Sequence, residues 1–515
     1  SNDVSTLSFE RESVPPFALS SYSVAATQAG NPLNLIEGTF SIARDSTNEV
    51  SGINSPFGQL VTANHDPAGR LTSITGSLNG NSLTTAIGFD GFGRRASVAH
   101  STGLGGSFGW DALDRPASIA WSGSDGATAQ NITEVLHYNT AGNISAIDRE
   151  SGTLALDYDD TDQVTSSSFS ASTGTALDQY LNRVWQYDAT GNRIQDSLRG
   201  AGTFKANSIL SDGLATYIPD AKGFGNVVER VSSDTGRDEL FTYRTDAKIT
   251  AFARRDVASE AANPIIAASY AYDALGRRVA KILVPKTGQS FTQIFLHLAD
   301  ENKILLGRAG DASLSLYVDG QGIDEHLGEV SSRAPAAYVT DHLDSVLNST
   351  LAGSAKMFAV FGENAPMGLD VSSASSPVLY GHTGRERDPE MEKDYFRTRE
   401  HDPWSGRFHS PDTIGLAGKD PNLFRYTKNS PLLNTDPTGK DSLGVAAGIF
   451  ACGLLVAAVK AELAIKEERI KACERAARTE SQKKECKNEK GPFGQWWSGE
   501  PVQGPWDVPG GSSKK

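Results

Sequence analysis

The side chains that could do chemistry in this chain are few and unevenly placed. Residues 440–515 contain no histidine, which removes the commonest general base and any Cys/His zinc set from that segment. The same segment holds no nuclease, deaminase or nucleotide-transfer motif. His342, His401 and His409 lie upstream, where we expect hydrogen-bonded structural residues rather than ligands or bases. We therefore expect no metal, no cofactor and no activity on an external substrate.

Aspartate recurs in a fixed setting, aromatic-Asp-x-x-Gly-Arg/Asn. An aspartate at the first position of a turn accepts hydrogen bonds from the backbone two residues on, and a glycine three residues later takes positive φ and returns the chain. These aspartates are therefore interpreted as turn caps, not catalysts. The clearest copies are His65-Asp66-Pro67-Ala68-Gly69-Arg70, Phe89-Asp90-Gly91-Phe92-Gly93-Arg94, Tyr187-Asp188-Ala189-Thr190-Gly191-Asn192 and Tyr272-Asp273-Ala274-Leu275-Gly276-Arg277.

The glycine position of this unit repeats along the chain, with room for two or more strands between copies. Where glycine is missing, Asn48, Asp114 and Asp162 tolerate left-handed geometry, whereas Ala247 does so poorly. The pattern predicts an all-β ribbon of antiparallel strands that spirals into a shell, with its turns paired edge to edge. The positions are 69, 93, 114, 142, 162, 191, 225, 247 and 276.

Charge divides the chain into two parts. The first 439 residues hold 35 Lys and Arg against 52 Asp and Glu, whereas residues 440–515 hold 13 against 10. An acidic body excludes an extended nucleic-acid surface, which needs clustered Lys and Arg. Cysteine occurs only at Cys452, Cys473 and Cys486, so no disulfide framework holds the strands. The chain opens at Ser1 with no visible signal peptide, which suggests a processed product or a fragment.

The repeated units resemble the YD repeats of the Rhs family. Residues 383–439 resemble that family's repeat-associated core domain, through Thr383-Gly384-Arg385-Glu386, His401-Asp402-Pro403, Gly406-Arg407-Phe408 and Asp436-Pro437-Thr438-Gly439. The resemblance covers nearly all of residues 40–439. It implies a β-shell that encloses a variable C-terminal polypeptide, as in bacterial polymorphic toxins and the C components of insecticidal toxin complexes.

The family's core domain often cuts its own chain with two aspartates, and the matching positions here are Asp412 and Asp436. Two neighbouring carboxylates divide the work, since one keeps its proton as an acid while the other activates water. The same residues in Pro/Gly-rich turns can simply be backbone caps. We expect at most an intramolecular aspartic-type autoprotease, cutting the bond between Lys440 and Asp441. Thr413 and Lys440 depart from the family's usual proline and apolar residue, which predicts slow or absent cleavage.

Residues 442–459 carry no charge and predict a helix about 27 Å long, close to the thickness of a bilayer core. Gly444, Gly448 and Gly453 would give this helix a small-residue face for close packing. The membrane-active interpretation competes with an alanine-rich helix buried against the shell. Both remain open.

We therefore expect a YD-repeat β-shell over residues 1–330, a core domain over 331–439 that closes it, and an α-helical tail over 440–515. The leading hypothesis is a secreted toxin-delivery shell whose cargo is its own tail. Its expected partners are an immunity protein, secretion machinery and a membrane, with no nucleic acid. The alternative is an extracellular recognition scaffold that does not cleave and whose tail is inert or an anchor.

Overall fold

The computed structural model divides into two compact units, Ser1–Ile449 and Phe450–Lys515. The second unit, and with it most of the predicted helical tail, lies outside the described residues. Described are residues 6–11, 19–25, 38–56, 58–123, 131–171, 178–221, 223–256, 264–273, 276–287, 290–297, 303–309, 313–332, 334–349, 357–363, 380–440 and 443–444.

The repeated turns form as their residue types predict. In the unit that starts at Asp66, the carboxylate Oδ1 accepts hydrogen bonds from the backbone N–H of Ala68 at 2.9 Å and of Arg70 at 3.0 Å. Gly69 has φ of 78°. Every other predicted glycine position also has positive φ, including Ala247 at 61°. The turn prediction is therefore confirmed.

These turns join a first sheet of 17 strands in the described part of the chain, paired antiparallel with sequence neighbours. A short helix, α1 (Asp178–Leu181), lies in the connection between the fourteenth and fifteenth strands, which still pair with each other. The strands are β1 (Thr6–Arg11), β2 (Leu19–Ala25), β3 (Gly38–Arg44), β4 (Val50–Ser55), β5 (Gly58–His65), β6 (Leu71–Leu78), β7 (Asn81–Phe89), β8 (Arg95–His100), β9 (Gly105–Trp110), β10 (Pro116–Ser122), β11 (Ile132–Tyr138), β12 (Ile144–Arg149), β13 (Gly152–Tyr158), β14 (Val164–Phe169), β15 (Arg183–Tyr187), β16 (Arg193–Asp196) and β17 (Gly200–Ala201).

A second sheet continues the ribbon with 14 strands among the described residues, again in sequence order. The all-β fold class is confirmed. The strands are β18 (Thr203–Lys205), β19 (Ser208–Ser211), β20 (Ala215–Pro219), β21 (Val227–Ser232), β22 (Arg237–Tyr243), β23 (Ile249–Asp256), β24 (Ile266–Tyr272), β25 (Arg278–Pro285), β26 (Phe291–His297), β27 (Lys303–Ala309), β28 (Ser313–Asp319), β29 (His326–Ser331), β30 (Pro335–Thr340) and β31 (Val346–Ser349).

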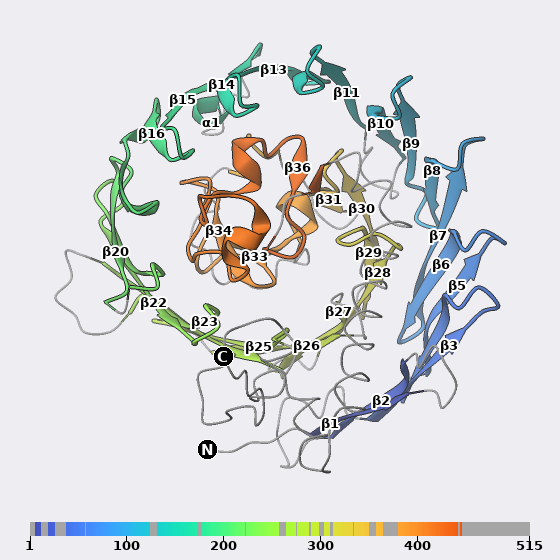
Figure 1. Ribbon diagram of the computed structural model, residues 1–515. Coiled ribbons are helices and arrows are strands. Elements are labelled where there is room, and N and C mark those ends of the chain that lie inside the picture. Colours follow the sequence, from blue (N-terminus) through green and yellow to red (C-terminus); the bar gives the residue numbers. More distant parts are fainter. Residues whose placement is uncertain are drawn as a thin grey trace, which may run out of the picture. The chain divides into compact units, whose positions relative to one another are not determined.

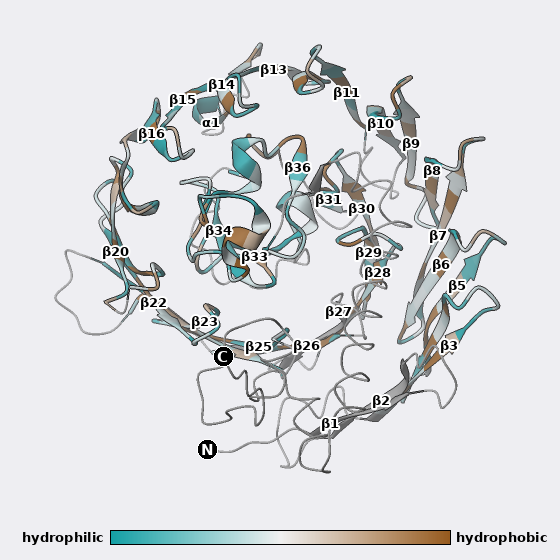
Figure 2. Ribbon diagram, in the orientation of Figure 1, coloured by the Kyte–Doolittle hydropathy of each residue, from teal (hydrophilic) through white to brown (hydrophobic). Residues whose placement is uncertain are grey.

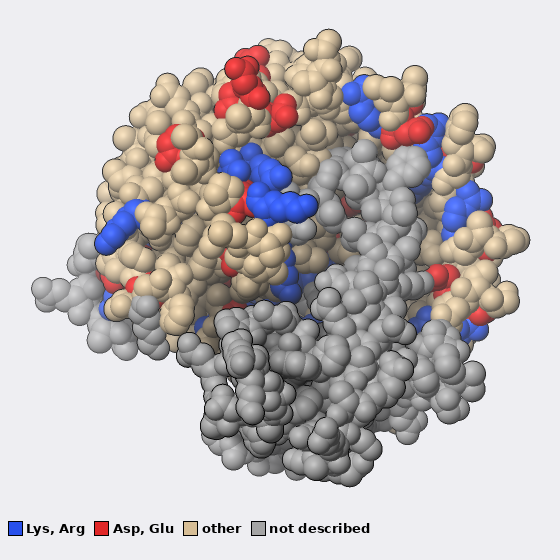
Figure 3. Space-filling view, viewed as in Figure 1, with Lys and Arg blue, Asp and Glu red and all other residues tan. Residues whose placement is uncertain are grey.

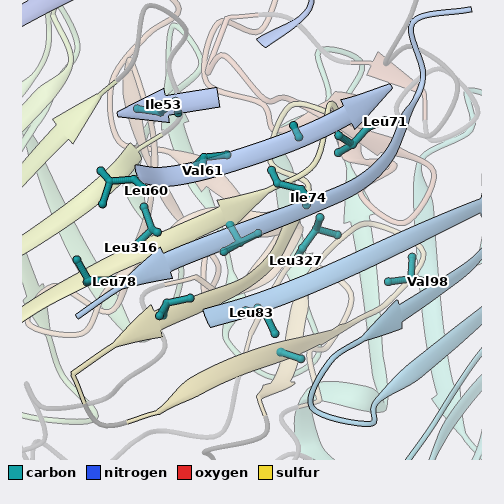
Figure 4. Packing of buried hydrophobic residues seen from close by; sticks show 14 of the residues in the cluster. Ile53, Leu60, Val61, Leu71, Ile74, Leu78, Leu83, Val98, Leu316 and Leu327 are labelled. Carbon is teal, nitrogen blue, oxygen red and sulfur yellow. The ribbon is translucent and has the colours of Figure 1, made fainter. Parts of the chain in front are cut away.

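The two sheets overlap face to face, which corrects the expectation of edge-to-edge pairing. Strands β6 and β7 contact β28, β29 and β30, yet among the described strands no backbone pairing joins one sheet to the other. Figure 4 shows the apolar side chains of both sheets meeting, with Leu60 and Leu78 near Leu316 and Ile74 near Leu327. Stacking the apolar faces removes more hydrocarbon from water than joining edges would.

The two sheets curve around a central segment, residues 380–440 (Figure 1). This segment has short elements and many turns, and most of its side chains are buried. Its elements are η3 (His382–Gly384), β32 (Glu386–Asp388), β33 (Lys393–Phe396), β34 (Arg399–Asp402), β35 (Arg407–Phe408), η4 (Gly415–Gly418), η5 (Thr427–Asn429) and β36 (Asn434–Thr435), which pairs with β37 (Leu443–Gly444).

Buried charges attach the central segment to the wall. Arg278 of β25 is fully buried and its Nη1 donates to Asp388 at 2.7 Å. Lys281, three residues further along β25, donates to the same carboxylate at 2.8 Å. Removing one partner of a buried ion pair leaves an unpaired charge away from water, which is strongly unfavourable. These ion pairs therefore fix the central segment against β25.

Along the wall, hydrophobic and hydrophilic residues are interspersed on the strands (Figure 2). On the face seen in Figure 3, most described surface is uncharged, and Lys and Arg lie among Asp and Glu. Within the described ranges, no helix is both long and apolar enough to span a membrane.

Candidate self-cleavage site

Each of the two predicted aspartates caps a turn of the central segment. Asp412 lies between β35 and η4, and its Oδ1 accepts a hydrogen bond from the backbone N–H of Ile414 at 2.9 Å. Asp436 follows β36, and its Oδ1 accepts from the backbone N–H of Lys440 at 2.9 Å. One oxygen of each carboxylate is therefore used locally, as the turn chemistry predicts.

The other carboxylate oxygens meet at one arginine. Nη2 of Arg399, in β34, lies 3.0 Å from Oδ2 of Asp412 and 3.0 Å from Oδ2 of Asp436. The structure thus brings together the two aspartates that are 24 residues apart in the sequence. It does so through a buried cation that joins both of them.

The guanidinium of Arg399 is held from several sides. Its Nη1 donates to the carbonyl of Leu423 at 3.0 Å, and its Cζ lies 3.6 Å from the centre of the Phe408 ring. Burial lowers the pKa of Arg399, and the carboxylates of Asp436 and Asp412 counteract that effect. Sequence reasoning missed this residue. The only available signal was its position just before His401-Asp402-Pro403 in the core-domain motif.

Arg399 also reaches the end of the central segment. Its Nε donates to the carbonyl oxygen of Gly439, which accepts a second hydrogen bond from Oγ1 of Thr398 at 2.8 Å. Two donors on one carbonyl can stabilise negative charge that develops there. The next amide, the N–H of Lys440, is bound by Asp436. Side chains therefore hydrogen-bond to both ends of the Gly439–Lys440 peptide group: Arg399 and Thr398 to its carbonyl, and Asp436 to its N–H.

Only glycine fits at position 439. Its φ is 70°, and a Cβ there would lie 2.2 Å from the carbonyl oxygen of Phe396. The close approach holds the chain against β33 and β34. A small pocket opens beside this junction, lined by Arg399, the two aspartates and Lys440 together with residues between 415 and 428.

The remaining predicted site residues divide into three groups. Lys440 is exposed, and Gly444 lies in the strand β37 instead of a helix. Asp441, Gly448 and Gly453 lie outside the described residues. His342 and His409 are hydrogen-bonded to Glu134 and Asp402, as expected. His401 does not form the expected hydrogen bond within the described part of the chain, and its Nδ1 lies 3.7 Å from Oδ2 of Asp394.

Two toxin proteins are similar to this chain in sequence. Toxin subunit YenC1 of Yersinia entomophaga is 26% identical over 216 residues, which are 38% of this chain and 21% of that protein. Toxin protein Tse5 of Pseudomonas aeruginosa is 28% identical over 261 residues, which are 44% of this chain and 19% of that protein. The chain thus matches about a fifth of the length of each relative. No protein-family model matches it.

Solved structures show the same fold. The crystal structure of TcdB2-TccC3 matches 83% of this chain and 24% of that chain, with a TM-score of 0.63 at 17% identity. A second crystal structure, of TcdB2-TccC3 without its hypervariable C-terminal region, gives a TM-score of 0.62 at 16% identity over 83% of this chain and 23% of that chain. The Tc holotoxin pore of Photorhabdus luminescens gives 0.63 at 17% identity, over 82% and 23%.

The chain is a ribbon of sequential antiparallel strands, with capped Asp-Gly turns and a curved wall around a buried central segment. These relatives are consistent with the resemblance of the sequence to the Rhs/YD-repeat family, and the fold of the chain is that of the TccC3-containing structures.

Proposed function

We propose that this chain is the shell of an Rhs-type toxin, which holds residues 440–515 as cargo and releases them by aspartate-dependent self-cleavage. The observation that carries the proposal is the junction itself. Arg399 contacts both aspartates and the carbonyl of Gly439, so the candidate catalytic carboxylates lie beside the segment to be cut.

The proposed step is hydrolysis of the Lys440–Asp441 peptide bond. One carboxylate takes a proton from water as the water oxygen bonds to the carbonyl carbon of Lys440, and the other carboxyl gives a proton to the departing nitrogen of Asp441. The products are a shell that ends in a carboxylate and a tail that begins with an amine. Arg399 and Thr398 hold the preceding carbonyl and so keep the junction in place.

The cargo proposal extends to where the tail acts. Residues 440–515 lack a histidine and have a net positive charge, and residues 442–459 are uncharged, which favours action on a membrane over enzymatic chemistry. The relatives are named as toxins, and one similar structure was solved without a hypervariable C-terminal region. We therefore propose secretion by a dedicated machinery, with an immunity protein that recognises the tail.

A second function is favoured by one feature of the same site. Each aspartate caps its own turn and pairs with Arg399, and such a closed set of contacts also suits a purely structural ion bridge. In that case the chain is an extracellular scaffold that stays intact. The departures at Thr413 and Lys440 point the same way.

Gel filtration followed by denaturing electrophoresis separates the two functions. A cleaved shell that retains its cargo elutes as one native species, which denaturant resolves into a large fragment and a tail of about 75 residues, as expected for cleavage at this junction. An intact chain under both conditions supports the scaffold. Two fragments that already separate in native buffer would show cleavage without encapsulation.

A further inference from the structure

Two histidines and an aspartate meet in the interior of the central segment. They are His382 of η3, Asp394 of β33 and His401 of β34. Asp394 and His401 are directly opposite each other in the antiparallel pair, so the register of the sheet fixes their proximity. One ligand atom from each residue lies within 4.8 Å of the other two.

The polar atoms of this cluster lack hydrogen bonds. Both ring nitrogens of His382, both of His401 and Oδ2 of Asp394 are buried and make no hydrogen bond in the described part of the chain, although Nδ1 of His401 lies 3.7 Å from Oδ2 of Asp394. The residues are only 0–1% exposed. Leaving one buried polar group unsatisfied costs about 1–3 kcal/mol, so five such atoms in one place indicate a bound species that satisfies several of them.

The residue types of this cluster suit a cation. Oδ1 of Asp394 accepts from Nη1 of Arg387 at 2.9 Å, which leaves Oδ2 directed to the cluster. Carboxylate and imidazole side chains are ligands that divalent transition-metal ions take in proteins.

We propose that His382, Asp394 and His401 bind a divalent transition-metal ion, with zinc as the first probe. Imidazole and carboxylate ligands suit zinc, and three protein ligands leave one position for water. With bonds of about 2.0–2.2 Å, the ligand atoms of a tetrahedral ion lie about 3.3–3.6 Å apart. The corresponding atoms lie within 4.8 Å of one another, so metal binding requires the side chains to move closer together. The site is closed to solvent, so its role is structural: it ties η3 to the β33–β34 pair.

The test is metal analysis of the full chain, purified without chelators. We expect about one equivalent of metal per chain, a lower melting temperature after chelation, and recovery when zinc is added back. Cobalt added to the metal-free protein should give visible d–d absorption bands. The variants His401→Gln and Asp394→Asn should lose the metal and the chelator effect. His409→Gln should keep both, because that buried histidine bonds to Asp402 and lies outside the cluster.

The proposal would be overturned by a wild-type chain that is metal-free as purified and binds neither zinc nor cobalt after reconstitution. In that case a buried water satisfies the cluster. Retention of metal by His401→Gln and Asp394→Asn alike would also overturn it, since the ion would then lie elsewhere. If the variants fail to fold, the wild-type titration alone still decides the matter.

Discussion

Nη2 of Arg399 lies 3.0 Å from Oδ2 of Asp436, although 37 positions separate the two residues in the sequence. The contact joins β34 to the turn in which the described central segment ends. Because the same nitrogen also lies 3.0 Å from Asp412, one guanidinium aligns both carboxylates and the chain beside them. The geometry of the junction therefore depends on a residue that is neither of the aspartates.

Arg399→Met should slow self-cleavage and destabilise the fold. Removing one partner of a buried ion pair costs about 3–5 kcal/mol, and here it leaves two carboxylates without their shared cation. Arg399→Lys keeps the positive charge but loses the planar guanidinium that reaches both carboxylates. We therefore expect a smaller loss of stability than in Arg399→Met, and cleavage slower than in the wild type. Urea unfolding and a gel time course measure the two effects. Arg244→Lys, in an exposed pair with Asp246, is the matched control and should change neither.

Ala247→Gly should stabilise the protein by about 1 kcal/mol. Ala247 has φ of 61°, where a side chain is strained and glycine is not. Thermal unfolding measures the change. Ala68→Gly, at a turn position without positive φ, should give no gain. Equal effects of the two substitutions would contradict the turn assignment.

Gly76→Val should destabilise by about 1–3 kcal/mol or more, because the two sheets meet there. A Cβ on Gly76 would lie 2.4 Å from Cγ2 of Val318 in β28. Gly91→Val is the control, since nothing lies within 4 Å of a Cβ at that turn position. Chemical denaturation of both variants, and of Gly76→Ala with Val318→Ala, would show whether shortening the partner restores stability. Unchanged stability of Gly76→Val would contradict the face-to-face overlap.

Acid should destabilise the wall in part through Glu239. Its carboxylate is buried between Arg230 and Arg254, at 3.3 and 2.7 Å. Burial opposes its ionisation, but the two arginines outweigh it and lower its pKa from 4.5 to about 2. The unfolded chain therefore binds a proton that the folded chain does not. About 3 kcal/mol of stability, complete above pH 4.5, is lost as the pH falls towards 2.

Urea unfolding between pH 3 and 6 measures that contribution. Glu239→Gln should be less stable at neutral pH but should show a flatter decline with acid. Glu229→Gln, on the neighbouring strand β21, should keep the wild-type slope. An unchanged slope in Glu239→Gln would contradict the assignment.

Local chemistry explains what could be predicted from the sequence. The turn at Asp66–Gly69 needs only neighbouring residues, so its cap and its positive φ could be predicted, and with them the all-β fold. Asp412 and Asp436 were predicted as a pair from a motif match, and in the structure both contact Arg399.

What could not be predicted depends on distant residues. No feature of the sequence around Arg399 predicts its contact with both aspartates. The need for glycine at position 76 is visible only in the fold, where Val318 packs against it. The grouping of His382 with Asp394 and His401 needs the sheet register as well as the fold of η3. Their spacing in the sequence does not by itself indicate that these three residues meet.

The most direct test of self-cleavage is intact-mass analysis of the wild-type chain beside Asp412→Asn, Asp436→Asn and Asp420→Asn. Asp420 is the control, because its carboxylate lines the same pocket but pairs with Arg425. We predict a fragment that begins at Asp441 in the wild type and in Asp420→Asn, and none in the other two. A fragment that begins at Lys440 would move the cut to the Gly439–Lys440 bond. An unbroken chain in all four proteins, or a fragment that persists in both aspartate variants, would contradict the account.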